Sequence, residues 1–155
     1  MSYLVDGHNL IPKFGLHLES PDDEEQLITR LQEFCRLRRT QVEVFFDGAP
    51  AGQAGIQKRS ALTIHFVRQG SSADAAIEAQ LARLGKAARN WTVVSSDGRV
   101  QQAARAAHAT VLSSEEFTRE LSRAQAIGAS RVKHQATLRP DEVEEWLDFF
   151  NQKKG

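Results

Sequence analysis

A chain of 155 residues is long enough for one domain with a buried core, and its 41% hydrophobic and 26% charged residues are typical of an ordinary soluble globular protein. Its 20 basic and 20 acidic residues cancel, so the net charge does not indicate a nucleic-acid partner, and any basic surface must come from local segregation. A single cysteine excludes an internal disulfide and a cysteine-based zinc cluster.

The first half of the chain predicts three strands and one long helix. Ser20 and Pro21, followed by acids, are typical of a helix start, because serine caps the first turn and acids favour the helix dipole. Cys35 continues the apolar spacing of this helix, so we expect it to be a small core residue. Strands are predicted at 3–5, 42–48 and 61–67, with a Gly-containing loop at 49–60.

The second half predicts helices and strands in alternation. A capping serine, Ser71 or Ser72, begins the first of these helices. Helices are predicted at 73–89, 99–109 and 115–127, and strands at 90–98 and 110–114. Alternation of this kind favours an α/β fold with a mainly parallel sheet.

The tail of the chain differs in charge, because no acid occurs at 121–140 while basic residues are frequent there. We expect an extended basic arm at 128–139, followed by a helix that begins at Pro140 and carries an apolar face. The whole chain (1–155) is then a single domain, with the basic arm and the C-terminal helix at 128–152.

The chain shows no signal for a membrane or for export. No apolar run approaches the roughly 20 residues that span a bilayer, and the first residues contain no secretory segment. We therefore expect a cytoplasmic protein without a membrane partner. These patterns leave the oligomeric state open.

Three aspartates, Asp6, Asp47 and Asp97, each follow an apolar run that predicts a strand. Ligands of open parallel sheets bind outside the carboxyl ends of the strands. If the three strands are neighbours, their carboxylates converge on one edge of the sheet. The alternative is a set of ordinary turns, because each aspartate precedes a glycine and Asp-Gly is a common turn signal.

Asp74 and Glu78 add two acids, four residues apart, on one face of the predicted helix after Ser72. Like charges at this spacing repel, and a bound cation would turn that cost into a gain. The alternative is a solvated helix face on which Asp74 merely favours the helix N-terminus. A set of oxygen ligands without a Cys or His cluster favours Mg²⁺ or Mn²⁺ over Zn²⁺.

The motifs "LVDGHNL", "VEVFFDG", "SADAAIEAQL" and "VVSSDGRVQQAARAAHATVLSSEEF", with the ending "LRPDEVEEWLDFF", resemble the YacP-like NYN domain family of the PIN-like nuclease superfamily. The resemblance covers nearly the whole chain. It implies a three-layer α/β/α sandwich around a mainly parallel sheet. It also implies a metal-dependent endoribonuclease that uses Mg²⁺ or Mn²⁺ and acts on messenger RNA in association with the ribosome.

The resemblance also assigns roles to single residues. The implied catalytic residues are Asp6, Asn9, Asp47, Asp74 and Asp97. The implied metal ligands are Asp6, Asp74, Asp97 and Glu78. Asn9 could orient a water, hold a carboxylate or contact a phosphate, and it could instead simply cap the turn at the strand end. Many PIN-like domains have a further acid where this chain has Gly98 and Arg99, so we expect one ion to be held more firmly than two.

RNA binding requires basic residues, because lysine and arginine contact phosphates without sequence preference. The candidates are Lys13, Lys58, Arg59, Arg68, Arg99, Arg131, Lys133 and Arg139. Each of them could also be a solvated surface charge. We expect His8 to be a loop residue rather than a catalytic base.

Two other classes of function stay open at this point. One is a catalytically silent module that binds RNA or the ribosome with the same fold, and the retained acids argue against it. The other is a phosphatase or receiver-type α/β domain. The segment "DGHNL" after the first strand lacks the D-x-D-x-[TS] pattern of a dehalogenase-type phosphatase, and "TVLSS" lacks the lysine of a receiver.

Overall fold

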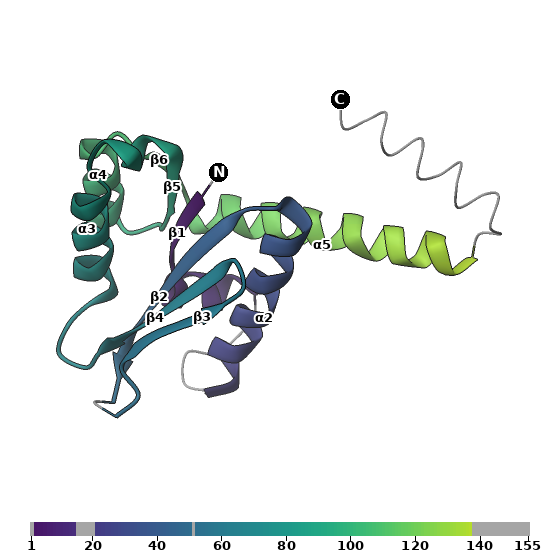
Figure 1. Cartoon of the computed structure of the whole chain (residues 1–155), viewed down its shortest axis with the longest axis horizontal. Helices are drawn as coiled ribbons and strands as arrows, with labels where there is room; N and C mark the ends of the chain where they lie inside the picture. Colours follow the sequence, from purple (N-terminus) through teal and green to yellow (C-terminus); the bar gives the residue numbers. More distant parts are fainter. Residues whose placement is uncertain (1, 15–20, 51, 138–155) are drawn as a thin grey trace.

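Six strands form one central sheet in the order β3-β4-β2-β1-β5-β6 (Figure 1). The computed structural model describes the backbone of residues 2–14, 21–50 and 52–137, and the side chains of 2–12, 23–50 and 52–127. The strands are β1 Ser2–Asp6, β2 Gln41–Ala49, β3 Gly55–Arg59, β4 Leu62–Arg68, β5 Trp91–Val94 and β6 Thr110–Leu112. All pairings are parallel except that of β3 with β4, which is antiparallel.

Helices cover both faces of the sheet. The α-helices are α1 Gly7–Leu10, α2 Pro21–Arg38, α3 Ala73–Leu84, α4 Gly98–Ala106 and α5 Ser114–Thr137. Two 3-10 helices, η1 Ile11–Phe14 and η2 Gly85–Asn90, connect them to the following segments. Figure 1 shows α3 and α4 on one side of the sheet and α2 and α5 on the other. This arrangement confirms the predicted three-layer α/β/α fold with a mainly parallel sheet.

Side chains alternate between the two faces along the buried strands and so build two apolar cores. Val5 and Val44 pack in the core under α2 and α5, whereas Leu4 and Phe45 pack in the core under α3 and α4. All four are at most 1% exposed, as expected for parallel strands that are buried on both faces. Cys35 belongs to the first core, which confirms its prediction as a small core residue.

The structure corrects the prediction for residues 49–60, which were expected to be a loop. Residues 55–59 form β3, an edge strand whose side chains are mostly exposed. An edge strand of this kind lacks the apolar alternation that marks a strand in a sequence, because neither of its faces is buried. Backbone pairing with β4 therefore decides the structure of this segment.

The predicted extended arm at 128–139 is also corrected. Helix α5 continues through this segment to residue 137. No proline occurs between Ser114 and Arg139, so the backbone can extend the helix that begins at Ser114. The helix predicted from Pro140 lies outside the described residues. None of the described helices has the length and apolar character needed to cross a bilayer.

Candidate active site

Three neighbouring strands, β2, β1 and β5, end at one edge of the sheet, which we call the carboxyl edge. Asp6 is the last residue of β1, Asp47 lies near the end of β2, and Asp97 follows β5. The condition on which their convergence depended, that the three strands are neighbours, is therefore met. Asp74 lies in the first turn of α3, close enough for the charges of Asp97 and Asp47 to raise its pKa in addition to the effect of burial. We call these four residues the acidic cluster.

Burial and mutual repulsion mark Asp6 as the most perturbed member of the acidic cluster. Its residue is 7% exposed, and the Ser95 hydroxyl donates a hydrogen bond to its Oδ2 at 3.4 Å. Burial raises the pKa of Asp6 to about 6, and the charges of Asp74 and Asp47 add to the shift. Burial also raises the pKa of Asp74, with a further contribution from Asp97. The cluster therefore concentrates negative charge where part of it is removed from water.

The glycines that follow Asp6, Asp47 and Asp97 differ in whether, and why, the structure requires glycine there. A Cβ on Gly7 would lie 2.3 Å from Cε1 of the buried Phe46 ring, so only glycine lets α1 begin this close to β2. Gly48 has a positive φ of 78°, as a turn requires, and it coincides with a register shift in β2. Gly98 has neither a close contact nor a positive φ, and it is the first residue of α4, directly after Asp97. The turn interpretation of Asp-Gly thus fits Gly48 alone among the three.

Asp97 is held by its helix and by the loop before it. Its carboxylate caps α4 by accepting a hydrogen bond from the Arg99 backbone N–H at 2.8 Å. Its own backbone N–H donates to the Ser95 hydroxyl at 3.0 Å. Ser95 thus contacts both Asp6 and Asp97, so one short segment orients two members of the acidic cluster.

Asn9 connects α1 to two other elements. Its Oδ1 accepts a hydrogen bond from the backbone N–H of Ser96 at 2.9 Å and a second, short one from the Ser114 hydroxyl. The Ser114 backbone N–H in turn donates to the Ser96 hydroxyl at 3.0 Å. The side-chain oxygen of Asn9 therefore fixes the loop before α4 against the start of α5. A role of Asn9 toward substrate stays a prediction.

His8 was expected to be a loop residue, but the structure places it between two carboxylates. Its Nδ1 lies 2.9 Å from Asp47 Oδ1 and its Nε2 lies 2.6 Å from Glu24 Oε2. The hydrogen bond to Glu24 is the main cause of a raised His8 pKa, opposed by partial burial. Sequence reasoning missed Glu24 because it belongs to the acids at the start of α2, which have a sufficient explanation in the helix dipole.

Glu78, a predicted metal ligand, forms an ion pair with Arg99. The Arg99 Nε and Nη2 atoms donate to its two carboxylate oxygens at 2.7 and 3.2 Å. Arg99 is one of the predicted RNA-binding residues, and its charge also favours the ionised form of Asp74. The Glu78 carboxylate is therefore shared with a cation of the chain itself, and its contact with a metal stays a prediction.

The other predicted RNA-binding residues are not all brought to the carboxyl edge. Arg68 is exposed at the end of β4, on the same edge as Asp47. Lys58 and Arg59 lie near the opposite edge because β3 runs antiparallel, and Arg59 pairs with Glu25 at 3.0 and 3.2 Å. The described side chains do not include those of Lys13, Arg131, Lys133 and Arg139. The backbone of Lys13 belongs to η1, that of Arg131 and Lys133 to α5, and Arg139 lies outside the described residues.

The donor chemistry of the acidic cluster fits a hard divalent cation, because every side-chain donor is a carboxylate. Burial, with mutual repulsion added to it, raises the pKa of Asp6 and Asp74. Within the described part of the chain, no three His, Cys, Asp or Glu side chains are already arranged as a ligand set. Mg²⁺ commonly uses only one or two carboxylates and completes its coordination with waters and substrate phosphates. The cluster therefore fits such an ion in chemical type without forming a closed cage.

A three-layer α/β/α fold around a mainly parallel sheet, with acids along its carboxyl edge, is an architecture of PIN-like nuclease domains, and the family match selects this class. The family model described as "YacP-like NYN domain" matches residues 3–153. The chain therefore belongs to the YacP-like NYN domain family, which supports a nuclease or RNA-related role.

Two solved structures of Rae1 (YacP) from Bacillus subtilis are similar to this chain. The W164L mutant is 25% identical, with a TM-score of 0.74 over 94% of this chain and 89% of that one. The other structure is 24% identical, with a TM-score of 0.73 over 99% of this chain and 94% of that one. No curated protein matches the chain in sequence.

Proposed function

We propose that this protein is a metal-dependent endoribonuclease that hydrolyses phosphodiester bonds of RNA in the cytoplasm, with messenger RNA on the ribosome as its substrate. The observation that carries the proposal is the acidic cluster, which the adjacent ends of β1, β2 and β5 and the first turn of α3 bring to one edge of the sheet. Ionised carboxylates this close together are costly unless a cation neutralises them. Membership of a nuclease superfamily supplies the reaction class.

Each residue of the site has a role in this proposal. Asp6, Asp74 and Asp97 would hold Mg²⁺ or Mn²⁺, which when bound supplies acidified water and charge neutralisation at the phosphodiester. His8 orients Asp47 through its Nδ1, and Asn9 fixes the loop that carries Asp97. Basic side chains at the same edge would contact the phosphates that flank the cleaved bond.

The decisive variant is Asp97→Asn, because asparagine caps a helix as well as aspartate does and removes only the charge. We expect cleavage of single-stranded RNA with Mn²⁺ or Mg²⁺ to fall roughly 100-fold or more, since a bound metal contributes several kcal/mol to such transition states. The melting temperature should stay close to that of the wild type. EDTA should abolish cleavage by the wild type.

Glu33→Gln is the matched control, because Glu33 is a carboxylate of α2 that pairs with Arg36 and belongs to no part of the site. It should cleave RNA as the wild type does. Equal cleavage by the wild type, Asp97→Asn and Asp6→Asn would trace the activity to a contaminant and refute the proposal. Salt-sensitive RNA binding without cleavage under either metal would instead indicate the catalytically silent binding module. Co-sedimentation with ribosomes tests the proposed partner.

A further inference from the structure

We infer that a cavity beside the acidic cluster, between α2 and the β3–β4 hairpin, binds one unpaired nucleobase of the RNA substrate. The cavity has a volume of about 540 Å³, within the usual range for ligand pockets. Asp47 lines it, so it adjoins the candidate active site directly. This inference deepens the proposed function and rests on it, because it assigns the neighbouring substrate subsite.

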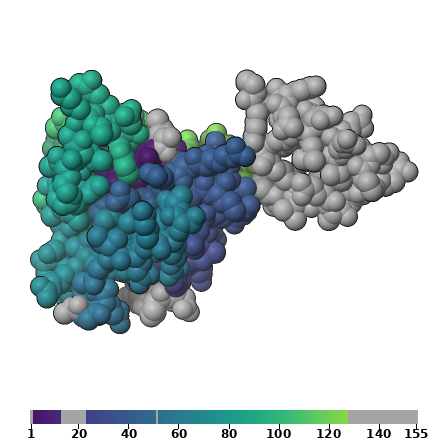
Figure 2. All heavy atoms as spheres, in the orientation of Figure 1, coloured from purple at the N-terminus to yellow at the C-terminus, as the bar shows by residue number. Residues whose placement is uncertain are grey.

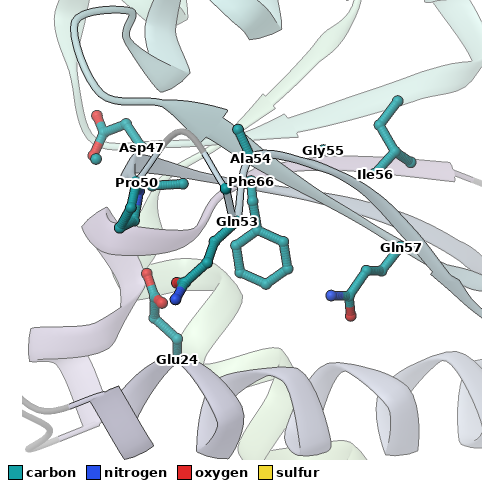
Figure 3. A pocket seen from close by; sticks show the side chains of 12 residues that line it. Glu24, Asp47, Pro50, Gln53, Ala54, Gly55, Ile56, Gln57 and Phe66 are labelled. Carbon is teal, nitrogen blue, oxygen red and sulfur yellow. The ribbon is translucent and has the colours of Figure 1, made fainter.

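An aromatic ring forms the apolar wall of the cavity. Figure 3 shows Phe66 of β4 in this wall, with Gln53 and Gln57 on either side of it. Phe66 is half-buried, and its ring stacks on the fully buried Phe46, with centroids 5.9 Å apart and planes 25° apart. The support from Phe46 holds one part of the ring in place. A ring that is fixed in this way is a ready platform for stacking a base.

The strand next to Phe66 leaves space at the ring. Gly55 of β3 pairs with Phe66 across the hairpin, so no β3 side chain stands beside the ring at that position. A Cβ on Gly55 would meet no atom within 4 Å, which shows that the space there is open. The space-filling view shows the β3–β4 hairpin at the surface of the described part of the chain (Figure 2). Gln53 and Gln57 line the cavity and are themselves exposed, so the described part of its lining is reached from solvent.

The polar lining suits the edge of a base. Gln53 and Gln57 are exposed, and an amide carries both donors and an acceptor, which is the pattern that pairs with base edges. The Gln57 Oε1 accepts a long hydrogen bond from Arg59 Nη2 at 3.5 Å, which leaves its NH₂ group to donate to a base. Glu24 faces them from α2 in Figure 3. Its carboxylate is already engaged by His8 at 2.6 Å, so it is held in place at the cavity wall.

Charge decides between a base and a phosphate as the occupant. Among the described side chains that line the cavity, the ionisable ones, Glu24 and Asp47, are both acids, and none is a lysine or an arginine. A phosphate group would be repelled there, whereas an uncharged base would not. Asp47 lines the cavity and belongs to the acidic cluster. A base stacked on Phe66 would therefore place the sugar-phosphate backbone of its nucleotide near the carboxyl edge.

The test uses a series of single-stranded RNA oligonucleotides. Each carries the fluorescent base 2-aminopurine at one position, and that position differs from one oligonucleotide to the next. The full-length Asp97→Asn protein with Mg²⁺ binds them without relying on cleavage. We expect one position to be quenched on binding, and Phe66→Leu in the same background to abolish that quenching. An abasic site at that position should weaken binding by roughly 5- to 150-fold, the range for loss of one stacked base.

Matched controls separate stacking from general damage. Phe66→Tyr keeps the ring and should keep the quenching. Gln102→Ala removes an exposed glutamine of α4 that does not line the cavity and should change nothing. If Phe66→Leu fails to melt cooperatively, Gln53→Ala combined with Gln57→Ala carries the test, because it removes only exposed side chains. That double variant should bind the base-containing RNA more weakly than its parent does, and its affinity for the abasic RNA should be unchanged.

The inference is overturned if quenching is the same in folded Phe66→Leu, if no position is quenched, or if the abasic RNA binds the wild-type cavity as tightly as intact RNA. Its failure is distinguishable from failure of the proposed function. Normal metal-dependent cleavage with Phe66-independent quenching would refute the base subsite alone. Absence of cleavage with Phe66-dependent quenching would refute the nuclease and retain the subsite.

Discussion

Asp6 is buried and has two like-charged neighbours, Asp74 and Asp47. Its pKa therefore depends on the other charges at the carboxyl edge. The raised pKa of about 6 is caused first by burial and then by Asp74 and Asp47. Between pH 3.8 and about 6, the folded protein therefore binds more protons at this residue than the unfolded chain does.

The sign of the resulting pH dependence follows from this difference. We predict that, in EDTA, the free energy of unfolding falls as pH rises from 4 to 6.5, by at most roughly 3 kcal/mol from Asp6. Asp6→Asn should remove this contribution. Urea unfolding of both proteins across that pH range measures it, and parallel pH profiles of the two proteins would contradict the prediction.

Gly7 is required by a contact rather than by a backbone angle. We predict that Gly7→Ala destabilises the protein by about 1–3 kcal/mol, as overpacking does, because its Cβ would collide with the fully buried Phe46. Gly98→Ala is the matched control, since it also follows an aspartate and its Cβ would meet no atom within 4 Å. Chemical denaturation compares the two, and equal stability would show that Phe46 shifts freely.

At the scale of the elements, Asn9 joins α1 to the loop before α4 and to the start of α5. We predict that Asn9→Ala costs about 1–3 kcal/mol, because it leaves the Ser96 N–H and the Ser114 hydroxyl without this acceptor. Asn9→Asp keeps an acceptor oxygen and should retain more of the stability.

The same two variants separate the structural role of Asn9 from a role toward substrate. If the Asn9 amide also contacts substrate, Asn9→Asp should fold and yet lose RNA cleavage, because it replaces a donor with a negative charge. Thermal melts and cleavage assays on the same samples make the comparison. Full cleavage by Asn9→Asp would limit Asn9 to its structural role.

Elements differ in how well the sequence predicts them, and the difference follows burial. The buried strands β1, β2 and β4 appear as apolar runs, and Ser72 caps α3 as predicted, accepting from the Ala75 N–H at 3.1 Å. The exposed edge strand β3 has no such pattern and was missed. Helix α5 was predicted too short because Gly128 and the basic residues after it were interpreted as an arm, although neither forbids a helix.

For the whole molecule, a net charge of zero conceals a separation of charge. The acidic cluster occupies the carboxyl edge, whereas Arg36, Arg39 and Arg59 line a cavity near the opposite edge, where Arg36 pairs with Glu33 and Arg59 with Glu25. Basic residues that remain close to the cluster, such as Arg68, therefore have a disproportionate part in holding a polyanion.

We predict that Arg68→Gln weakens RNA binding evenly across RNA sequences and reduces the slope of log affinity against log salt by about one. Arg105→Gln is the control, because Arg105 is also exposed but lies in the last turn of α4, away from the carboxyl edge where that helix begins. Fluorescence anisotropy over a salt series tests both variants. Identical slopes for the two variants would rule out a specific role for Arg68.

The sequence by itself determined the α/β class, the buried strands and the four aspartates, because apolar periodicity and strand-end carboxylates are local features of the chain. Tertiary structure alone decided the pairing of His8 with Glu24, the ion pair of Glu78 with Arg99 and the cavity at Phe66. Each of these contacts joins residues from different elements, and their proximity depends on strand order and helix placement, which no local pattern encodes.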